Sequence, residues 1–138
     1  MKLKHSAPLA AIATATIIFN FSSCTYEDGP TFSLKSKTGR LVGEWNVLEL
    51  AGTKATNNTI YEMEFEKDGD IELKIEYDYG GYSYSNTIKG EWEWGNGKES
   101  LELDFDGGFN YELEIKRLTN KELKAEDEDG DDWEMEKI

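Results

Sequence analysis

Apolar and polar residues alternate with a period of two along nearly all of the chain after residue 59. Such alternation is typical of strands in a sheet that packs on one face and meets water on the other. Helical spacing, with apolar residues three and four apart, does not appear. Short turns rich in Gly, Asp and Asn separate the alternating stretches, so the pattern predicts an antiparallel meander of strands joined by hairpins.

The turn lengths predict the register of these hairpins, because a slip of one residue would move an apolar set to the wet face. The two-residue turn Gly80-Gly81 pairs Tyr79 with Tyr82 and Tyr77 with Tyr84. The other predicted cross-strand pairs are Phe65 with Ile71, Glu72 with Lys89, Trp94 with Leu101, Phe105 with Phe109, and Lys124 with Glu134.

The stretch from residue 41 to residue 50 reads as the first strand, centred on Gly43-Glu44-Trp45. The indole of Trp45 can fold under one end of a barrel as a plug, with Gly43 letting the neighbouring backbone come close. An ordinary core Trp is the alternative. The tally is about eight strands, an even number that closes readily into an up-and-down barrel without exposed edges. An open sheet folded into a sandwich is the alternative fold.

The first 23 residues differ from the rest. Lys2, Lys4 and His5 precede an apolar run from residue 9 to residue 21, which is short for a membrane-spanning helix. This pattern predicts a secretory signal peptide over residues 1–23. Small residues come directly before Cys24, which resembles a bacterial lipobox, and the chain has no second cysteine to form a disulfide. We therefore expect lipidation of Cys24, the alternative being a plain signal peptide with an unmodified thiol.

Residues 24–39 lack apolar periodicity and are expected to form the lipidated cysteine and a flexible linker, followed by one domain over residues 40–138. Glu27 and Asp28, just behind Cys24, look like a surface-export signal, although a solvated acidic linker explains them equally well. Loss of Lys2 and Lys4 with the signal would take the net charge from −14 to −16. This charge makes nucleic acid an unfavourable partner.

The start at Gly43-Glu44-Trp45, the number and order of strands and the long first loop at residues 51–58 together resemble the lipocalin-like domain lipoproteins of Bacteroidetes. The resemblance covers about residues 40–138. It implies a closed end where a cation covers Trp45 and an open mouth that admits a ligand. Lipocalins use an arginine over the tryptophan, and here Lys137 stands in that place, so Arg117 is expected to substitute.

Loops at residues 51–58, 80–81, 106–108 and 127–131 should share one end of the meander, the mouth. Six aromatic residues gather there and are the predicted ligand-binding residues: Tyr77, Tyr79, Tyr82, Tyr84, Phe105 and Phe109. Their rings and hydroxyls suit small amphipathic molecules. The alternative is a filled barrel that acts as a protein-interaction or glycan-binding accessory module.

Loss of His5 and lipidation of Cys24 would leave a domain without imidazole or free thiol, which excludes the usual nucleophilic sites and zinc ligands. Its carboxylates lie mostly on outward positions or in turns, where burial cannot separate the two pKa values that a glycosidase pair needs. The acidic loop at residues 127–131 does not fit a calcium-binding EF-hand, because Ala125 falls at the first ligand position. We therefore predict no enzyme, no metal and no cofactor.

The predicted protein is exported and lipid-anchored to the outer membrane, facing either the periplasm or the cell surface. Its barrel binds a small hydrophobic or amphipathic molecule at the mouth. The sequence identifies no ligand and no protein partner.

Overall fold

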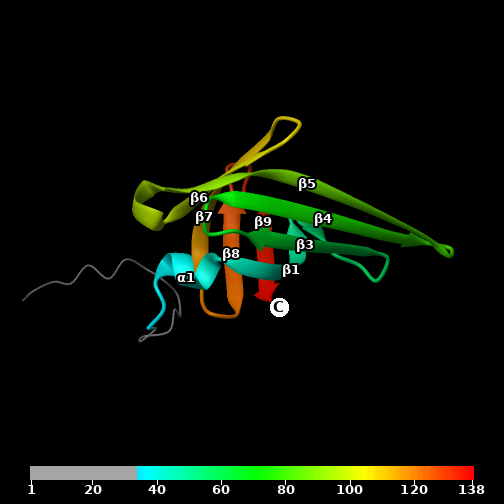
Figure 1. The fold of residues 1–138 in the computed structure, drawn as a ribbon, viewed down its shortest axis with the longest axis horizontal. Helices are drawn as coiled ribbons and strands as arrows, with labels where there is room; N and C mark the ends of the chain where they lie inside the picture. The colour runs from blue at the N-terminus through cyan, green and yellow to red at the C-terminus, as the bar shows by residue number, and fades with distance from the viewer. Residues whose placement is uncertain (1–33) are drawn as a thin grey trace, which may run out of the picture.

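Residues 34–138, which the computed structural model describes, form an antiparallel sheet of nine strands that closes on itself (Figure 1). The strands are β1 (Gly43–Leu50), β2 (Thr53–Lys54), β3 (Thr59–Phe65), β4 (Asp70–Tyr79), β5 (Tyr82–Gly95), β6 (Ser100–Phe105), β7 (Phe109–Leu118), β8 (Glu122–Asp127) and β9 (Asp132–Lys137). A short 3-10 helix, η1 (Asn96–Lys98), joins β5 to β6. The predicted all-β meander is confirmed. The predicted signal peptide, Cys24 and the first part of the linker lie outside the described residues.

The barrel closes because β1 pairs with β3 on one side and β9 on the other. Trp45 is the partner of Met63 across the first pairing and of Lys137 across the second. β2 is a short extra strand that folds back on the end of β1. Eight strands therefore make the closed ring, and the barrel is observed instead of the alternative sandwich.

The hairpin registers predicted from turn lengths are confirmed. Tyr79 lies opposite Tyr82, and Tyr77 lies opposite Tyr84. The remaining predicted pairs are also found: Phe65 with Ile71, Glu72 with Lys89, Trp94 with Leu101, Phe105 with Phe109, and Lys124 with Glu134. The last includes an ion pair of 2.9 Å, and Lys89 is ion-paired with Glu72.

A helix, α1 (Lys37–Leu41), covers one end of the barrel and begins inside the segment expected to be a flexible linker. Ser36 caps it, since the hydroxyl accepts a hydrogen bond of 3.0 Å from the backbone N–H of Gly39. Arg40 donates to the Leu118 carbonyl at 3.1 Å, and Leu41 is fully buried. The linker boundary predicted at residue 39 is therefore too late. Within residues 34–138 no helix is long and apolar enough to cross a membrane.

Trp45 is fully buried beneath α1, as expected of the closed end. Its indole N–H donates to the Leu41 carbonyl at 2.7 Å. The ammonium of Lys137 lies 4.7 Å from the centre of the indole ring and donates to the Arg40 carbonyl at 2.7 Å and the Val42 carbonyl at 2.5 Å. Gly43, with φ of 123°, lies directly beneath Lys137, because a Cβ there would stand 3.1 Å from the lysine Cε. The expected cover of Trp45 by Arg117 is wrong.

A β-bulge explains why the Arg117 side chain points out of the barrel and not over Trp45. The register of β7 on β8 shifts by one residue between Ile115 and Arg117. The extra residue makes Leu118 the next buried position after Ile115 and turns Arg117 outward, where its Nε lies 2.8 Å from Glu122. Strict alternation would have placed Arg117 inside the barrel, which is why the sequence pattern misplaced it.

Candidate functional site

A cavity of about 250 Å³ opens at the mouth, the end of the barrel opposite α1. Its walls are inward positions of the central strands together with the end of β1 and the start of β2. The residues that line it are Leu50, Ala51, Thr53, Tyr61, Leu73, Ile75, Ile88, Phe105, Phe109, Tyr111 and Trp133. The core below the cavity is filled by large side chains, Trp45, Phe65 and Met63 among them. The barrel is therefore solid at the closed end and hollow at the mouth.

Trp133 anchors the cavity wall on β9. It is 1% exposed, and its indole N–H donates to Asp127 Oδ2 at 3.0 Å. Its ring meets that of Tyr111 edge to face, with centroids 4.9 Å apart and planes at 66°. The edge-to-face contact and the indole hydrogen bond together fix the position of the Trp133 ring in the cavity wall.

The chemistry of the lining is uncharged. Among the described residues that line the cavity there is no acidic or basic side chain, and the side-chain hydroxyls are those of Thr53, Tyr61 and Tyr111. Burial raises the pKa of the Tyr61 phenol, with Tyr77 adding to the effect, so the hydroxyl stays protonated at neutral pH. The cavity can therefore bury apolar surface and offer hydrogen bonds from neutral groups. Its lining has no charged side chain that could pair with an ionic ligand.

Of the six residues predicted to bind a ligand, Phe105 and Phe109 line this cavity. Phe105 is 3% exposed and Phe109 is 57% exposed, so Phe109 lies at the rim. The four tyrosines lie outside the lining, on the part of the β4–β5 hairpin that extends beyond the barrel. Tyr77, Tyr79, Tyr82 and Tyr84 are 43%, 80%, 84% and 62% exposed.

These tyrosines continue the inward face of β4 and β5 outward from the cavity. Ile75 and Ile88 belong to the cavity wall. Beyond the pair of Ile75 with Asn86, the next cross-strand pair on the same face is Tyr77 with Tyr84, and the last pair before the turn is Tyr79 with Tyr82. The four rings form a ladder, here called the tyrosine ladder, that leads away from the cavity.

Three further aromatic residues of the lining, Tyr61, Tyr111 and Trp133, are not among the ligand-binding residues predicted from the sequence. The alternation correctly places all three inside. It carries no information on whether neighbouring side chains fill the space between them, because that depends on how the strands splay at the mouth. Nearness to the mouth along each strand was the one available signal.

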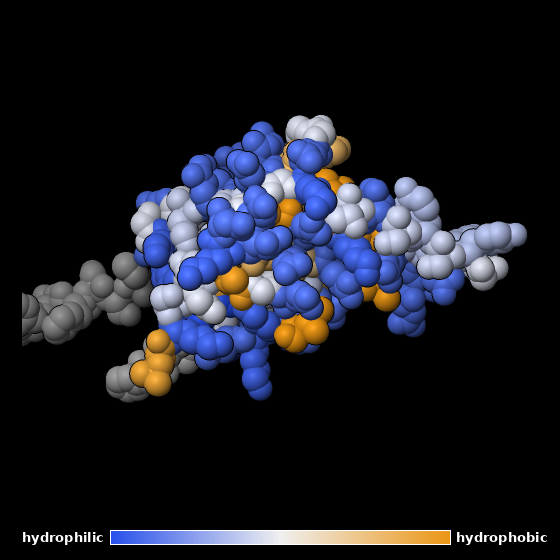
Figure 2. All heavy atoms as spheres, viewed as in Figure 1, coloured by the Kyte–Doolittle hydropathy of each residue, from blue (hydrophilic) through white to orange (hydrophobic). Residues whose placement is uncertain are grey.

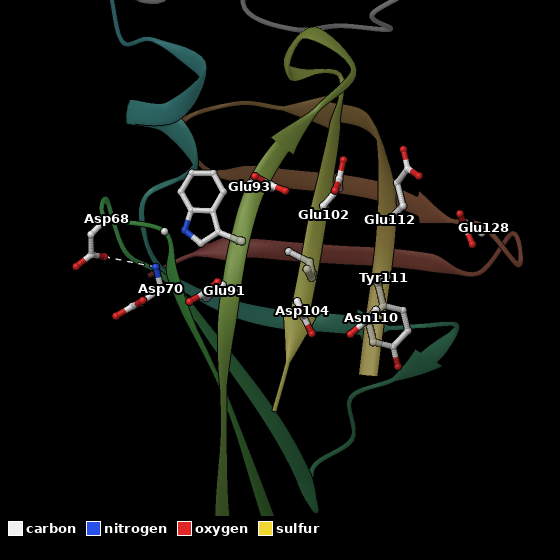
Figure 3. A pocket seen from close by; sticks show the side chains of 13 residues that line it. Asp68, Asp70, Glu91, Glu93, Glu102, Asp104, Asn110, Tyr111, Glu112 and Glu128 are labelled. Atoms are coloured by element: carbon white, nitrogen blue, oxygen red, sulfur yellow. Dashed lines mark hydrogen bonds between the residues drawn. The ribbon is translucent and has the colours of Figure 1, made fainter. Parts of the chain in front are cut away.

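A larger hollow, of about 590 Å³, lies on the outer face of β5, β6 and β7 (Figure 3). Outward carboxylates line it in register across the strands: Glu93, Glu102 and Glu112 in one row, and Glu91 and Asp104 with Asn110 in the next. In Figure 3 these side chains fan out from the strands and do not converge on one point. Within the described residues no group of three or more His, Cys, Asp or Glu side chains is placed to hold a metal ion. The hollow is an acidic surface trough.

The acidic loop between β8 and β9 is organised by Asp127. Its carboxylate accepts hydrogen bonds from the backbone N–H of Asp129 at 3.1 Å and of Asp131 at 3.0 Å, besides the bond from Trp133. Burial opposes the charged form of Asp127, but these hydrogen bonds outweigh it and hold the pKa of the carboxyl below its usual 3.8. Asp127 therefore acts as a structural cap that ties its loop to the cavity wall.

Comparison with known proteins gives one match. The family model described as a lipocalin-like domain matches residues 41–125, more than half of the chain. No curated protein and no solved structure matches the chain. The matched residues run from the end of α1 to the middle of β8 and include most of the cavity lining.

Proposed function

Since the chain belongs to the lipocalin-like domain family, whose fold generally serves binding or transport, we propose that its barrel binds a small uncharged apolar or amphipathic molecule in the mouth cavity. The observation that carries the proposal is the uncharged lining. The chain contains 29 acidic and 15 basic residues, and yet none of those within residues 34–138 lines the cavity. A lining without charged side chains is unsuited to an ionic ligand, because a charge buried there would have no partner. It suits a ligand that buries apolar surface.

The size of the cavity limits the ligand. A volume of about 250 Å³ exceeds the ~150 Å³ that holds a benzene molecule and falls just below the ~300–1,000 Å³ of common ligand pockets. A molecule of a few rings or a short branched chain fits it. The hydroxyls of Tyr61 and Tyr111 would orient any polar group of such a ligand, and the tyrosine ladder offers stacking surfaces to a part that protrudes.

Filling the cavity tests the proposal. Ile75→Trp places a larger side chain in the cavity wall, and Ile60→Trp is the matched control because Ile60 is 43% exposed and does not line the cavity. The probe is N-phenyl-1-naphthylamine, an uncharged dye that fluoresces in apolar surroundings. We expect Ile75→Trp to weaken dye binding at least about tenfold and Ile60→Trp to leave it within about twofold. Equal dye affinity in both variants would count against the cavity as the site.

A second candidate function rests on the tyrosine ladder, whose rings stand outside the cavity and are more than half exposed at three of its four positions. Exposed aromatic faces of this kind stack on sugar rings, which supports a glycan-binding accessory module. Affinity electrophoresis in polysaccharide gels separates the candidates. Glycan binding through the ladder would be lost in the double variant Tyr79→Ala, Tyr82→Ala and kept in Ile75→Trp.

For the location of the barrel we propose export and anchoring by a lipid on Cys24 in an outer membrane of Bacteroidetes type. The support comes from the sequence alone: the small residues before Cys24 and the lack of a second cysteine. Replacing Cys24 with Ser should release the protein from the membrane fraction and abolish incorporation of labelled fatty acid. Membrane fractionation that is unchanged, with no label in either form, would refute the lipid anchor.

A further inference from the structure

The β4–β5 hairpin reaches well beyond the barrel and leaves one edge of β5 open. β5 is 14 residues long, but its pairing with β6 covers only Gly90–Gly95. The hairpin is the long extension in Figure 1, and its β5 side runs past the point where β6 turns away. From Tyr82 to Thr87 every residue of β5 is exposed, and within residues 34–138 no strand pairs with this side of it.

The direction of the backbone groups along this edge follows from two hydrogen bonds. The Lys89 carbonyl accepts from the backbone N–H of Asp106 at 2.8 Å, so Lys89 points its backbone groups away from β4. The Trp92 N–H donates to the Gly69 carbonyl at 2.7 Å, so even-numbered residues point theirs toward the β4 side. Because backbone direction alternates along a strand, the N–H and C=O groups of Ser83, Ser85 and Thr87 face the open side.

This edge lacks the features that normally protect an open strand. Proteins place charges, prolines or very short strands at such edges to prevent pairing with other chains. β2, the strand at the end of the sheet order, fits that rule, with two residues and Lys54. The ten residues from Tyr79 to Ile88 carry no charge and no proline, although the net charge of the chain is −14. Figure 2 shows the pale hairpin tip against the blue surface of the barrel.

We propose that this β5 edge pairs antiparallel with the same edge of a second copy of the chain. One register uses every open group: Ser85 opposite Ser85 of the second copy, with Ser83 and Thr87 opposite each other on either side. It would form six backbone hydrogen bonds between the copies, two for each of the three pairs.

The local charge pattern permits a second copy at this edge, although two chains of net charge −14 repel each other as a whole. A twofold axis brings a segment against itself, so any charged edge would oppose like charges. The β5 edge itself is neutral, and the nearest carboxylates, Glu76 and Asp78, lie one strand further in on β4, opposite Ser85 and Ser83, so two acidic chains can pair here without like charges directly opposed. Tyr82 and Tyr84 project from the sheet face and not from its edge, so the pairing leaves the tyrosine ladder and the cavity open. The proposal is therefore independent of ligand binding.

Proline at the edge tests the pairing. Ser85→Pro removes an N–H that faces only the open side and leaves the bonds to β4 intact, and Ser85→Ala is the matched control. Sedimentation velocity of the full chain over a wide concentration series should show a shift from one chain to two. Ser85→Pro should weaken dimer formation at least about tenfold, because the twofold axis doubles the lost bond, while Ser85→Ala leaves it unchanged. Added salt should strengthen the dimer by screening its net charge.

A cysteine pair tests the register. In Ser85→Cys the new thiols face each other across the axis at a Cα separation of about 5.5 Å, within disulfide range. In Ser83→Cys they are offset by four residues and should not meet. Rapid oxidation to a disulfide dimer in Ser85→Cys alone, against wild type with its single Cys24, supports the proposal. A wild-type chain that stays monomeric at every concentration, or Ser85→Cys and Ser83→Cys dimers forming at equal rates, would overturn it.

Discussion

Lys137 covers Trp45 at the closed end, the role that the sequence pattern predicted for Arg117. Its ammonium lies over Trp45 and donates to the carbonyls of Arg40 and Val42 at the end of α1. Burial lowers the pKa of Lys137 from its usual 10.5, with nearby Lys35 adding to the effect. The residue therefore joins β9 to α1, and it closes the barrel end as well as covering the tryptophan.

Paired substitutions distinguish Lys137 from Arg117. Lys137→Met keeps an apolar stem but leaves carbonyls of α1 without their donor, which should lower the free energy of unfolding by about 1–3 kcal/mol. Arg117→Met breaks a half-exposed ion pair with Glu122 and should cost less than about 1 kcal/mol. Urea unfolding followed by tryptophan fluorescence measures both. An Arg117 variant as destabilised as the Lys137 variant would contradict the assigned roles.

Asp127 gives the barrel an acid-sensitive contribution to stability. Its pKa is lower in the folded protein than the usual 3.8, so the folded state binds the proton less readily than the unfolded chain. The stability it contributes is present above pH ~3.8 and is lost as the pH falls through the lowered value.

The substitution Asp127→Asn keeps an acceptor for Trp133 but removes the charge. We expect a loss of about 1 kcal/mol at pH 7, since charge-assisted hydrogen bonds are the stronger kind. This deficit relative to wild type should shrink as the pH is lowered below 4. Urea midpoints measured across that range check it, and a deficit that stays constant with pH would show that the charge of Asp127 is unimportant.

Among the elements, the hairpin of β4 and β5 carries two different surfaces. The tip pair of the tyrosine ladder is at least 80% exposed, so Tyr79→Ala and Tyr82→Ala should each change the free energy of unfolding by less than about 0.5 kcal/mol. Tyr61→Ala is the comparison, because Tyr61 is 8% exposed and its loss should cost about 3 kcal/mol. Thermal unfolding of the three variants measures the difference. A large loss from the tip pair would mean that these rings pack in the fold.

The elements also show what a sequence pattern can and cannot predict. Turn lengths were enough to place Tyr79 opposite Tyr82 and Phe105 opposite Phe109, because each slip would expose an apolar set. No such signal marks the bulge before Arg117. A bulge changes the face of the sheet toward which the following residues point, but it leaves no mark in the residue types of β7. α1 is five residues long and contains Gly39, so its local helix propensity is poor. It forms through tertiary contacts of Arg40 and Leu41 that no local pattern contains.

The candidate site was predictable only in part for a related reason. Phe105 and Phe109 could be placed at the mouth because aromatic residues beside a turn must lie near an end of the barrel, and both line the cavity. Tyr61, Tyr111 and Trp133 have the same inward pattern as the filled core around Trp45. Whether such residues touch one another or enclose a space depends on strand curvature, which is a property of the whole barrel.

At the scale of the whole molecule, charged side chains cover the outer surface but are absent from the lining of the mouth cavity. The net charge is −14 and acidic residues cover the outer face, including the trough of Figure 3, while the lining of the mouth cavity is neutral. A charged ligand, above all an anion, would meet repulsion outside and desolvation inside. An uncharged apolar ligand meets neither.

The most direct test of this account compares two dyes on the wild-type protein. N-phenyl-1-naphthylamine and 8-anilino-1-naphthalenesulfonate share one ring skeleton and differ by a sulfonate. Fluorescence titration should show the uncharged dye saturating at one molecule per barrel and the sulfonate binding at least about tenfold more weakly. Equal affinity for the two dyes, or no saturable binding of the uncharged one, would contradict the claim that the cavity is built for a small uncharged ligand.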